Sequence, residues 1–219
     1  LITGGKDTVA VRVPNHPVTL ELLELLSFPL AAPSANPFNQ ISPTKPAHVE
    51  RYFKNELKMV LDGGACTNGI ESTIIGFENG EPIIYRLGAL ALEDIEAVIG
   101  KVEIKNKKEE NPDAPGMLDK HYSPKTLTVL TSDIPSEIKK YPTKKIGVLA
   151  YNSTFKTDEI ITEIILSKTS DLHEAASKLY DALHELDHLN LDVIIAEKLP
   201  ETGLGTSMND RLERAAFNN

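Results

Sequence analysis

Two polar side chains, Ser34 and Asn36, lie on a loop framed by Pro33 and Pro37, and Ser42 follows six residues after Asn36. Small residues lead into the loop, so its backbone could approach a ligand closely. Hydroxyl and amide groups beside a helix N-terminus are typical of anion binding. Turn chemistry explains the same residues equally well. Neither G-x-x-x-x-G-K-[ST] nor G-x-G-x-x-G occurs, which excludes a standard nucleotide-binding loop.

Arg12 is the first of two arginines that could bind an anion. Residues 8–13 alternate with a period of two, which predicts a strand whose valines enter the core. The other face carries Thr8 and Arg12, about 13 Å apart. A guanidinium can bind a carboxylate or phosphate through two parallel hydrogen bonds, although a strand arginine is more commonly part of a surface ion pair.

Arg86 is the second such arginine. Asn79-Gly80 stands between two β-rich runs, which predicts a β-hairpin. With a two-residue turn, Thr73 faces Arg86 and Ser72 lies one step away. Ser72 and Arg86 should therefore meet at the open end of the hairpin, and this neutral neighbour favours a ligand for Arg86 over an ion pair.

Residues 184–188 match H-E-x-x-H, the pattern of zinc proteases. We reject a metal site because the apolar stripe of this helix is centred on Leu179, and His184 and His188 should face solvent on the other side. The Gly203-Leu204-Gly205 turn predicts a tight connection into the last helix rather than a phosphate site.

The elements that must position these residues follow from hydrophobic periodicity and turn signals. Helices are expected at residues 17–26, 42–55 (with Ser42 or Thr44 as N-cap), 90–99, 160–166, 172–186 and 207–217. Strands are expected at residues 8–13, 29–32, 58–62, 72–77, 82–87, 127–130, 146–151 and 193–196. Alternation of strands and helices after residue 126 predicts a small parallel sheet with helices on its faces.

Composition narrows the class of protein. The chain of 219 residues has a net charge of −9, which disfavours a broad nucleic-acid surface. Cys66 is the only cysteine, so no internal disulfide can form, and a cytoplasmic setting fits. No apolar run approaches the roughly 18 residues of a membrane span. Residues 101–124 are polar and aperiodic, which predicts a long linker that is disordered or functional.

Several short motifs, in order along the chain, resemble the threonylcarbamoyl-AMP synthases, the YrdC-like family in its long, two-domain form. They are Thr8-Val9-Ala10-Val11-Arg12-Val13-Pro14, Ala32-Pro33-Ser34-Ala35-Asn36, Ser42-Pro43-Thr44, Glu71-Ser72-Thr73, Arg86-Leu87-Gly88 and Pro115-Gly116-Met117 with His121-Tyr122-Ser123-Pro124. The resemblance implies an α/β fold. Residues 1–100 would be the C-terminal part of a twisted-sheet YrdC-like catalytic domain, residues 101–125 a linker or lid over the active site, and residues 126–219 a Rossmann-like domain.

The resemblance also implies an activity. The family is a nucleotidyltransferase that condenses L-threonine, bicarbonate or CO2, and ATP into threonylcarbamoyl-AMP, releasing pyrophosphate. A tRNA threonylcarbamoyl transferase then passes the group to adenosine 37 of tRNA. Direct tRNA binding is expected to be weak or absent, and no membrane is involved.

Carried over by position, the resemblance assigns the site residues. The assignments are Arg12, Ala32 and Ser72 for threonine, Thr8, Ser34, Ser42, Arg86 and Tyr122 for ATP, and Ser34 and Asn36 for catalysis. Mg²⁺ would be held mainly by the nucleotide, with no metal ligands from the chain. The family's N-terminal part carries a Lys and an Arg with no counterpart here, so the chain is expected to be an incomplete copy that lacks activity by itself.

Two other readings stay open. One is an RNA-binding or translation-associated module without catalysis, which would need a continuous basic stripe. The other is a carbamoyl transferase of hydrogenase maturation, which the linker and the C-terminal part argue against.

Overall fold

Four parallel strands form the larger of two sheets in the computed structural model, which describes residues 3, 5, 7–105, 121–155 and 157–217. The strand order is β4-β7-β5-β6. The strands are β4 (Leu127–Thr131), β5 (Ile146–Ala150), β6 (Ile160–Ile165) and β7 (Val193–Glu197). The helices are α4 (Ile134–Ile138), α5 (Leu172–Asp187) and α6 (Leu204–Ala215).

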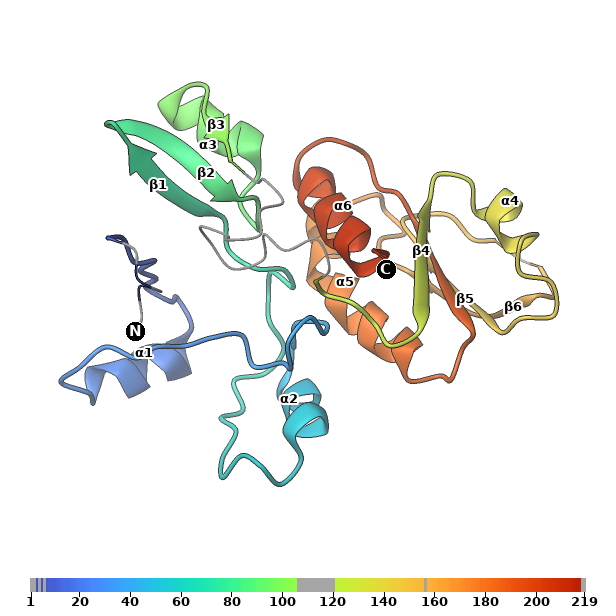
Figure 1. The fold of residues 1–219 in the computed structure, drawn as a ribbon, viewed down its shortest axis with the longest axis horizontal. Helices are drawn as coiled ribbons and strands as arrows, with labels where there is room; N and C mark the ends of the chain where they lie inside the picture. Colours follow the sequence, from blue (N-terminus) through green and yellow to red (C-terminus); the bar gives the residue numbers. More distant parts are fainter. Residues whose placement is uncertain (1–2, 4, 6, 106–120, 156, 218–219) are drawn as a thin grey trace.

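Helices cover both faces of this sheet (Figure 1). Residues of α5 and α6 pack on one face against Leu149 and Ile194, and α4 packs on the other face against Val148 and Ile195. Alternate residues of β5 and β7 thus point to opposite faces, and all five residues of β5 are buried. This three-layer arrangement confirms the predicted α/β class and the parallel sheet.

The prediction of a helix at residues 160–166 is wrong, because this segment is strand β6 at the edge of the sheet. Its isoleucines can be read at helical spacing, but the segment is short and rich in β-branched residues, which favour a strand. Pairing with β5 decides between the two readings.

The smaller sheet contains the predicted hairpin, in which β1 (Ile74–Glu78) and β2 (Glu81–Arg86) are antiparallel. Both Asn79 and Gly80 have positive φ, as a tight hairpin turn requires. The register shifts between Ile74 and Ile75, so Arg86 pairs with Ile74 and not with Thr73 as expected. A bulge adds one residue to one strand, which sequence spacing cannot reveal.

Helix α3 (Leu92–Ile99) follows the hairpin as predicted. A short strand, β3 (Glu103–Ile104), then pairs with β2 in parallel, inside the segment expected to be an irregular linker. The rest of that segment, residues 106–120, lies outside the described residues.

Helices α1 (Pro17–Glu24) and α2 (Pro46–Phe53) form where helices were predicted. The predicted strands at residues 8–13, 29–32 and 58–62 are wrong, since none is assigned as a strand and none of the described residues before Ile41 is buried. Val11 is 83% exposed. An extended segment becomes a strand only when a neighbour takes its hydrogen bonds, and no described strand lies beside these three. No helix in the described ranges is long and apolar enough to cross a membrane.

The N-terminal half reaches the large sheet by packing on α5. Ile41 and Ile70 are buried in the same apolar cluster as the inner faces of α5 and α6. Gly69 has φ +70°, and a Cβ added there would lie 2.3 Å from the carbonyl oxygen of Ala176. Only glycine permits this approach of the loop backbone to the helix backbone.

Candidate functional site

A largely buried carboxylate, that of Glu71, joins segments from different parts of the chain. Its Oε1 accepts a hydrogen bond from Ser42 Oγ at 2.7 Å, and its Oε2 accepts one from the Tyr180 hydroxyl at 3.0 Å. The Arg211 guanidinium donates to Oε2 from Nε and from Nη2, both at 3.3 Å. The Arg211 carbon Cζ lies 5.8 Å from the centre of the Tyr122 ring. We call Ser42, Glu71, Tyr122, Tyr180 and Arg211 the Glu71 cluster.

The charges of this cluster are balanced within it. Arg211 is fully buried, and the Glu71 side chain is 18% exposed. Burial alone would raise the pKa of the Glu71 carboxyl, but the Arg211 guanidinium and the Ser42 hydroxyl together hold it below its usual range. Burial raises the pKa of Tyr180 well above its ordinary value, so its hydroxyl keeps its proton and donates it. The result is a carboxylate with donors on both oxygens.

Ser72 and Arg86 meet at the open end of the hairpin, as predicted. Arg86 donates two hydrogen bonds to the Ser72 carbonyl, from Nε at 3.2 Å and from Nη2 at 2.8 Å. Arg86 is 9% exposed. The Ser72 carbonyl thus fixes the orientation of the guanidinium, and the Ser72 side chain itself is exposed.

Helix α6 supports the same two segments from the C-terminal half. Ser207 Oγ donates to the Gly88 carbonyl at 3.0 Å, and Arg211, one turn further, holds Glu71. The amide of Ala89 donates to the Glu71 carbonyl at 2.8 Å. A Cβ on Gly88 would lie 2.3 Å from the Ser72 backbone. The two motif segments are thus in backbone contact with each other.

Tyr122 is 1% exposed and adopts φ 58°. Its ring stacks on Tyr180 with centroids 5.4 Å apart, and burial raises its pKa to about 12. The neighbouring His121 amide donates to the Arg214 carbonyl at 3.4 Å. The end of the predicted linker is therefore anchored on α5 and α6, beside Glu71.

The Ser34–Asn36 loop is described but is not in the Glu71 cluster. Asn36 Nδ2 donates to the carbonyls of Pro37 and Gln40 at 3.0 and 3.1 Å, which is turn chemistry. Its Oδ1 is buried and accepts no hydrogen bond from the described part of the chain. Gln40 forms a bridge with Ser123, so the loop ends next to the Tyr122 segment.

Four of the predicted site residues stay apart from the others. Thr8, Arg12 and Ala32 are exposed, as is Ser34. Across the residues that the structure describes, no hydrogen bond or ion pair links any of these four to Ser42, Ser72 or Arg86. The structure thus places Ser42 and Tyr122 in the Glu71 cluster and Ser72 against Arg86. It leaves Thr8, Arg12, Ala32 and Ser34 exposed and Asn36 half-buried in its own turn.

The prediction that Ser42 or Thr44 caps helix α2 is wrong. The N-cap of α2 is Lys45, which makes no side-chain cap hydrogen bond. The Ser42 hydroxyl donates to Glu71 instead. The Thr44 amide donates to His48 Nδ1 at 3.2 Å.

The prediction that His184 faces solvent is also wrong, although His188 is exposed as expected. His184 is 4% exposed and its Nε2 lies 3.2 Å from the Ser42 carbonyl oxygen. Helix α2 covers a second face of α5, which the apolar stripe of α5 alone does not indicate. Within the described ranges, no group of three or more His, Cys, Asp or Glu side chains is placed to hold a metal ion.

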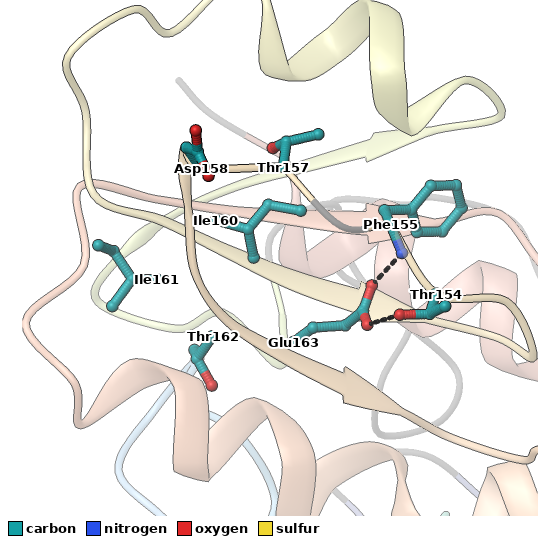
Figure 2. A pocket seen from close by; sticks show the side chains of 8 residues that line it. All are labelled: Thr154, Phe155, Thr157, Asp158, Ile160, Ile161, Thr162 and Glu163. Atoms are coloured by element: carbon teal, nitrogen blue, oxygen red, sulfur yellow. Dashed lines mark hydrogen bonds between the residues drawn. The ribbon is translucent and has the colours of Figure 1, made fainter.

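A pocket of about 360 Å³ lies elsewhere, at the β6 edge of the large sheet (Figure 2). Glu163 closes one side of it by accepting hydrogen bonds from Thr154 Oγ1 and the Phe155 amide. None of the predicted site residues lines this pocket, so it is separate from the Glu71 cluster.

Sequence reasoning missed Tyr180 and Arg211. Arg211 carried a usable signal: at about 100° per residue it falls within about 60° of Met208, on the apolar side of α6. A charged residue on that side needs a buried partner. Glu71, the first residue of the Glu71-Ser72-Thr73 motif, is that partner.

The sheet, the hairpin and the Glu71 cluster define an α/β protein whose C-terminal helices support a polar site built from its N-terminal half. A family model described as "Threonylcarbamoyl-AMP synthase, C-terminal domain" matches residues 90–217, and one described as "Telomere recombination" matches residues 1–88. The chain belongs to the threonylcarbamoyl-AMP synthase family, which confirms the resemblance drawn from its motifs.

Curated relatives agree. The chain is 37% identical to the threonylcarbamoyl-AMP synthase of Pyrococcus abyssi over 99% of its own length and 66% of that protein. It is 34% identical to the Bacillus subtilis synthase, over 98% of the chain and 65% of the relative. It is 33% identical to the Schizosaccharomyces pombe synthase, over 99% of the chain and 59% of the relative. The chain thus spans about two thirds or less of the length of these relatives.

Solved structures show the same fold. The crystal structure of P. abyssi Sua5 complexed with L-threonine superposes with a TM-score of 0.86 at 37% identity, covering 98% of this chain and 66% of that one. A variant of the same protein, with an adjacent His and Tyr changed to Ala, gives a TM-score of 0.87 at 36% identity, with 98% and 64% coverage.

Proposed function

We propose that this protein acts in the synthesis of threonylcarbamoyl-AMP from L-threonine, bicarbonate or CO2, and ATP, with release of pyrophosphate. The observation that carries the proposal is the family match along both halves, together with a polar site in which Glu71 binds Ser42 and the adjacent Ser72 binds Arg86. The P. abyssi relative was solved with L-threonine, which supports a threonine site here.

We assign roles as the family resemblance implies. Arg12, Ala32 and Ser72 would bind threonine, and Ser34 and Asn36 would act in catalysis. The ATP ligands would be Thr8, Ser34, Ser42, Arg86 and Tyr122. The buried, unpaired Oδ1 of Asn36 supports a ligand at its loop, since such atoms are rarely left without a partner.

Tyr122 has a further argument in its favour. The chain contains one adjacent His-Tyr pair, His121-Tyr122. The same pair of residue types was changed to Ala in the P. abyssi variant. We propose that residues 101–125 act as a lid between a catalytic domain (residues 1–100) and a Rossmann-like domain (residues 126–219), with Tyr122 anchoring its end.

Mg²⁺ would be held mainly by the nucleotide phosphates. When bound, it would neutralise phosphate charge in the adenylyl transfer. The chain's own contribution would be positioning and charge stabilisation by Arg86 and the hydroxyl groups. The product would pass to a tRNA threonylcarbamoyl transferase in the cytoplasm, a setting that the single exposed cysteine suits.

The test uses the full-length protein with labelled bicarbonate. We expect labelled threonylcarbamoyl-AMP and an equal amount of pyrophosphate only when L-threonine and ATP are both present. An Asn36→Ala variant should lose the product while keeping the fold. ATP hydrolysis that does not depend on threonine, or binding of tRNA without any product, would reject the proposal.

A further inference from the structure

The Ser42 hydroxyl has one proton, and the structure shows where it goes. Ser42 Oγ donates to Glu71 Oε1 at 2.7 Å. A hydroxyl that donates its proton to one partner can offer only lone pairs to another. A phosphate oxygen is also an acceptor, so Ser42 in this arrangement cannot hydrogen-bond to it.

Glu71 is held in the state that takes this proton. Arg211 and Tyr180 donate to its Oε2, and the Arg211 guanidinium is fully buried. Among the described residues, the next carboxylate oxygen is Asp210 Oδ2, at 3.5 Å from Arg211 Nη1. A neutral Glu71 would leave the buried Arg211 charge poorly compensated. Glu71 therefore stays an acceptor, and Ser42 stays its donor.

The anchors of Glu71 come from the C-terminal half, on α5 and α6. Tyr180 is 109 residues and Arg211 is 140 residues from Glu71 in sequence. The family-matched C-terminal segment thus reaches the Ser42 hydroxyl through one carboxylate.

We propose that Glu71 is a positioning residue that fixes Ser42 as a hydrogen-bond acceptor, so that Ser42 meets a donor group of the nucleoside and not its phosphates. Tyr180 and Arg211 set this orientation from α5 and α6. The inference rests on the proposed function, because Ser42 is an ATP ligand only within it. The donor is a ribose hydroxyl or the adenine amino group.

Binding of nucleotide analogues to the full-length protein tests the proposal. The probes are ATP, 2′-deoxy-ATP, 3′-deoxy-ATP and inosine triphosphate, which lacks the amino group, each measured by calorimetry. We expect one analogue to bind about tenfold more weakly than ATP, as the loss of one hydrogen bond predicts. In Ser42→Ala the same analogue and ATP should bind equally, and the analogue affected identifies the donor.

Tyr180→Phe tests the link to α5, because it removes the hydroxyl and keeps the ring. The variant should bind ATP about fivefold more weakly, and this effect should vanish in the Ser42→Ala background. Lys178→Gln is the matched control on the same helix, since its exposed pair with Glu174 should contribute nothing to binding.

The outcomes separate the two proposals. If Ser42→Ala weakens ATP binding but no analogue discriminates, or if Tyr180→Phe acts equally in both backgrounds, the inference is overturned and the proposed site stands. If Ser42→Ala binds ATP as tightly as the wild type, the assignment of Ser42 to the nucleotide fails, and the inference fails with it.

Discussion

The imidazole of His48 stacks on that of His184, with ring centroids 3.8 Å apart. The two rings come from α2 and α5 and lie where these two helices meet. His48 Nε2 is 3.2 Å from Asp181 Oδ1, and Lys45 pairs with the same carboxylate. Burial lowers the pKa of each histidine to about 4, although Asp181 opposes it for His48 and the Ser42 carbonyl opposes it for His184. Both rings are therefore neutral in the folded protein near neutral pH.

This pair should make stability depend on pH. The unfolded chain protonates these histidines near pH 6.5, whereas the folded state does so near pH 4. Between these values the unfolded state binds more protons than the folded state. The contribution of the two neutral histidines to the free energy of unfolding is therefore fully present above pH 6.5 and is lost as the pH drops towards 4. The loss is at most about 3 kcal/mol for each histidine.

His184→Gln tests this dependence, because glutamine can still donate to the Ser42 carbonyl but cannot titrate. The free energy of unfolding is measured by denaturant titration at a series of pH values. Its slope against pH should be shallower for the variant than for the wild type. His173→Gln, an exposed histidine on the same helix, should leave the slope of the wild type unchanged. Equal slopes for all three proteins would contradict the prediction.

Gly69→Ala should destabilise the contact between α5 and the N-terminal half. The added Cβ would lie 2.3 Å from the Ala176 carbonyl oxygen at a positive φ, so backbone strain and a clash add up to about 2–4 kcal/mol. Gly64→Ala is the control, since Gly64 has the same sign of φ with nothing within 4 Å. Chemical denaturation should show the larger loss for Gly69→Ala, and equal losses would argue against the close approach.

Tyr122 should stabilise the protein through its ring. Tyr122→Ala removes a buried side chain that packs on Tyr180 and Arg211, and this should cost about 3–5 kcal/mol. Tyr122→Phe keeps the ring and should unfold close to the wild type. Thermal and chemical unfolding measure both variants, and a similar loss for Phe and Ala would assign the role to the hydroxyl instead.

Arg86→Lys should weaken ligand binding more than stability. Lysine keeps the charge but lacks the planar fork that makes two bonds to the Ser72 carbonyl. We expect ATP affinity to fall about tenfold by calorimetry. Arg51→Lys, an exposed arginine on α2, serves as the control. Unchanged affinity in Arg86→Lys would remove this residue from the proposed ATP site.

Much of the fold was predictable because its signals are local. Asn79-Gly80 specified the hairpin, the stripe around Leu179 specified α5, and alternating elements specified a parallel sheet. The order of short motifs gave the family, and the hairpin alone brought Ser72 to Arg86. Each of these conclusions needs only residues that are close in sequence, or a pattern that a single element carries.

Tertiary structure decided the rest, for reasons that sequence spacing does not contain. Whether residues 8–13 form a strand depends on a neighbouring strand, and whether His184 is buried depends on α2. The bulge that moved Arg86 opposite Ile74 left no signal in the sequence. The salt bridge between Glu71 and Arg211 joins residues 140 positions apart, and only the packing of α6 beside the segments that contain Glu71 and Gly88 places one within reach of the other.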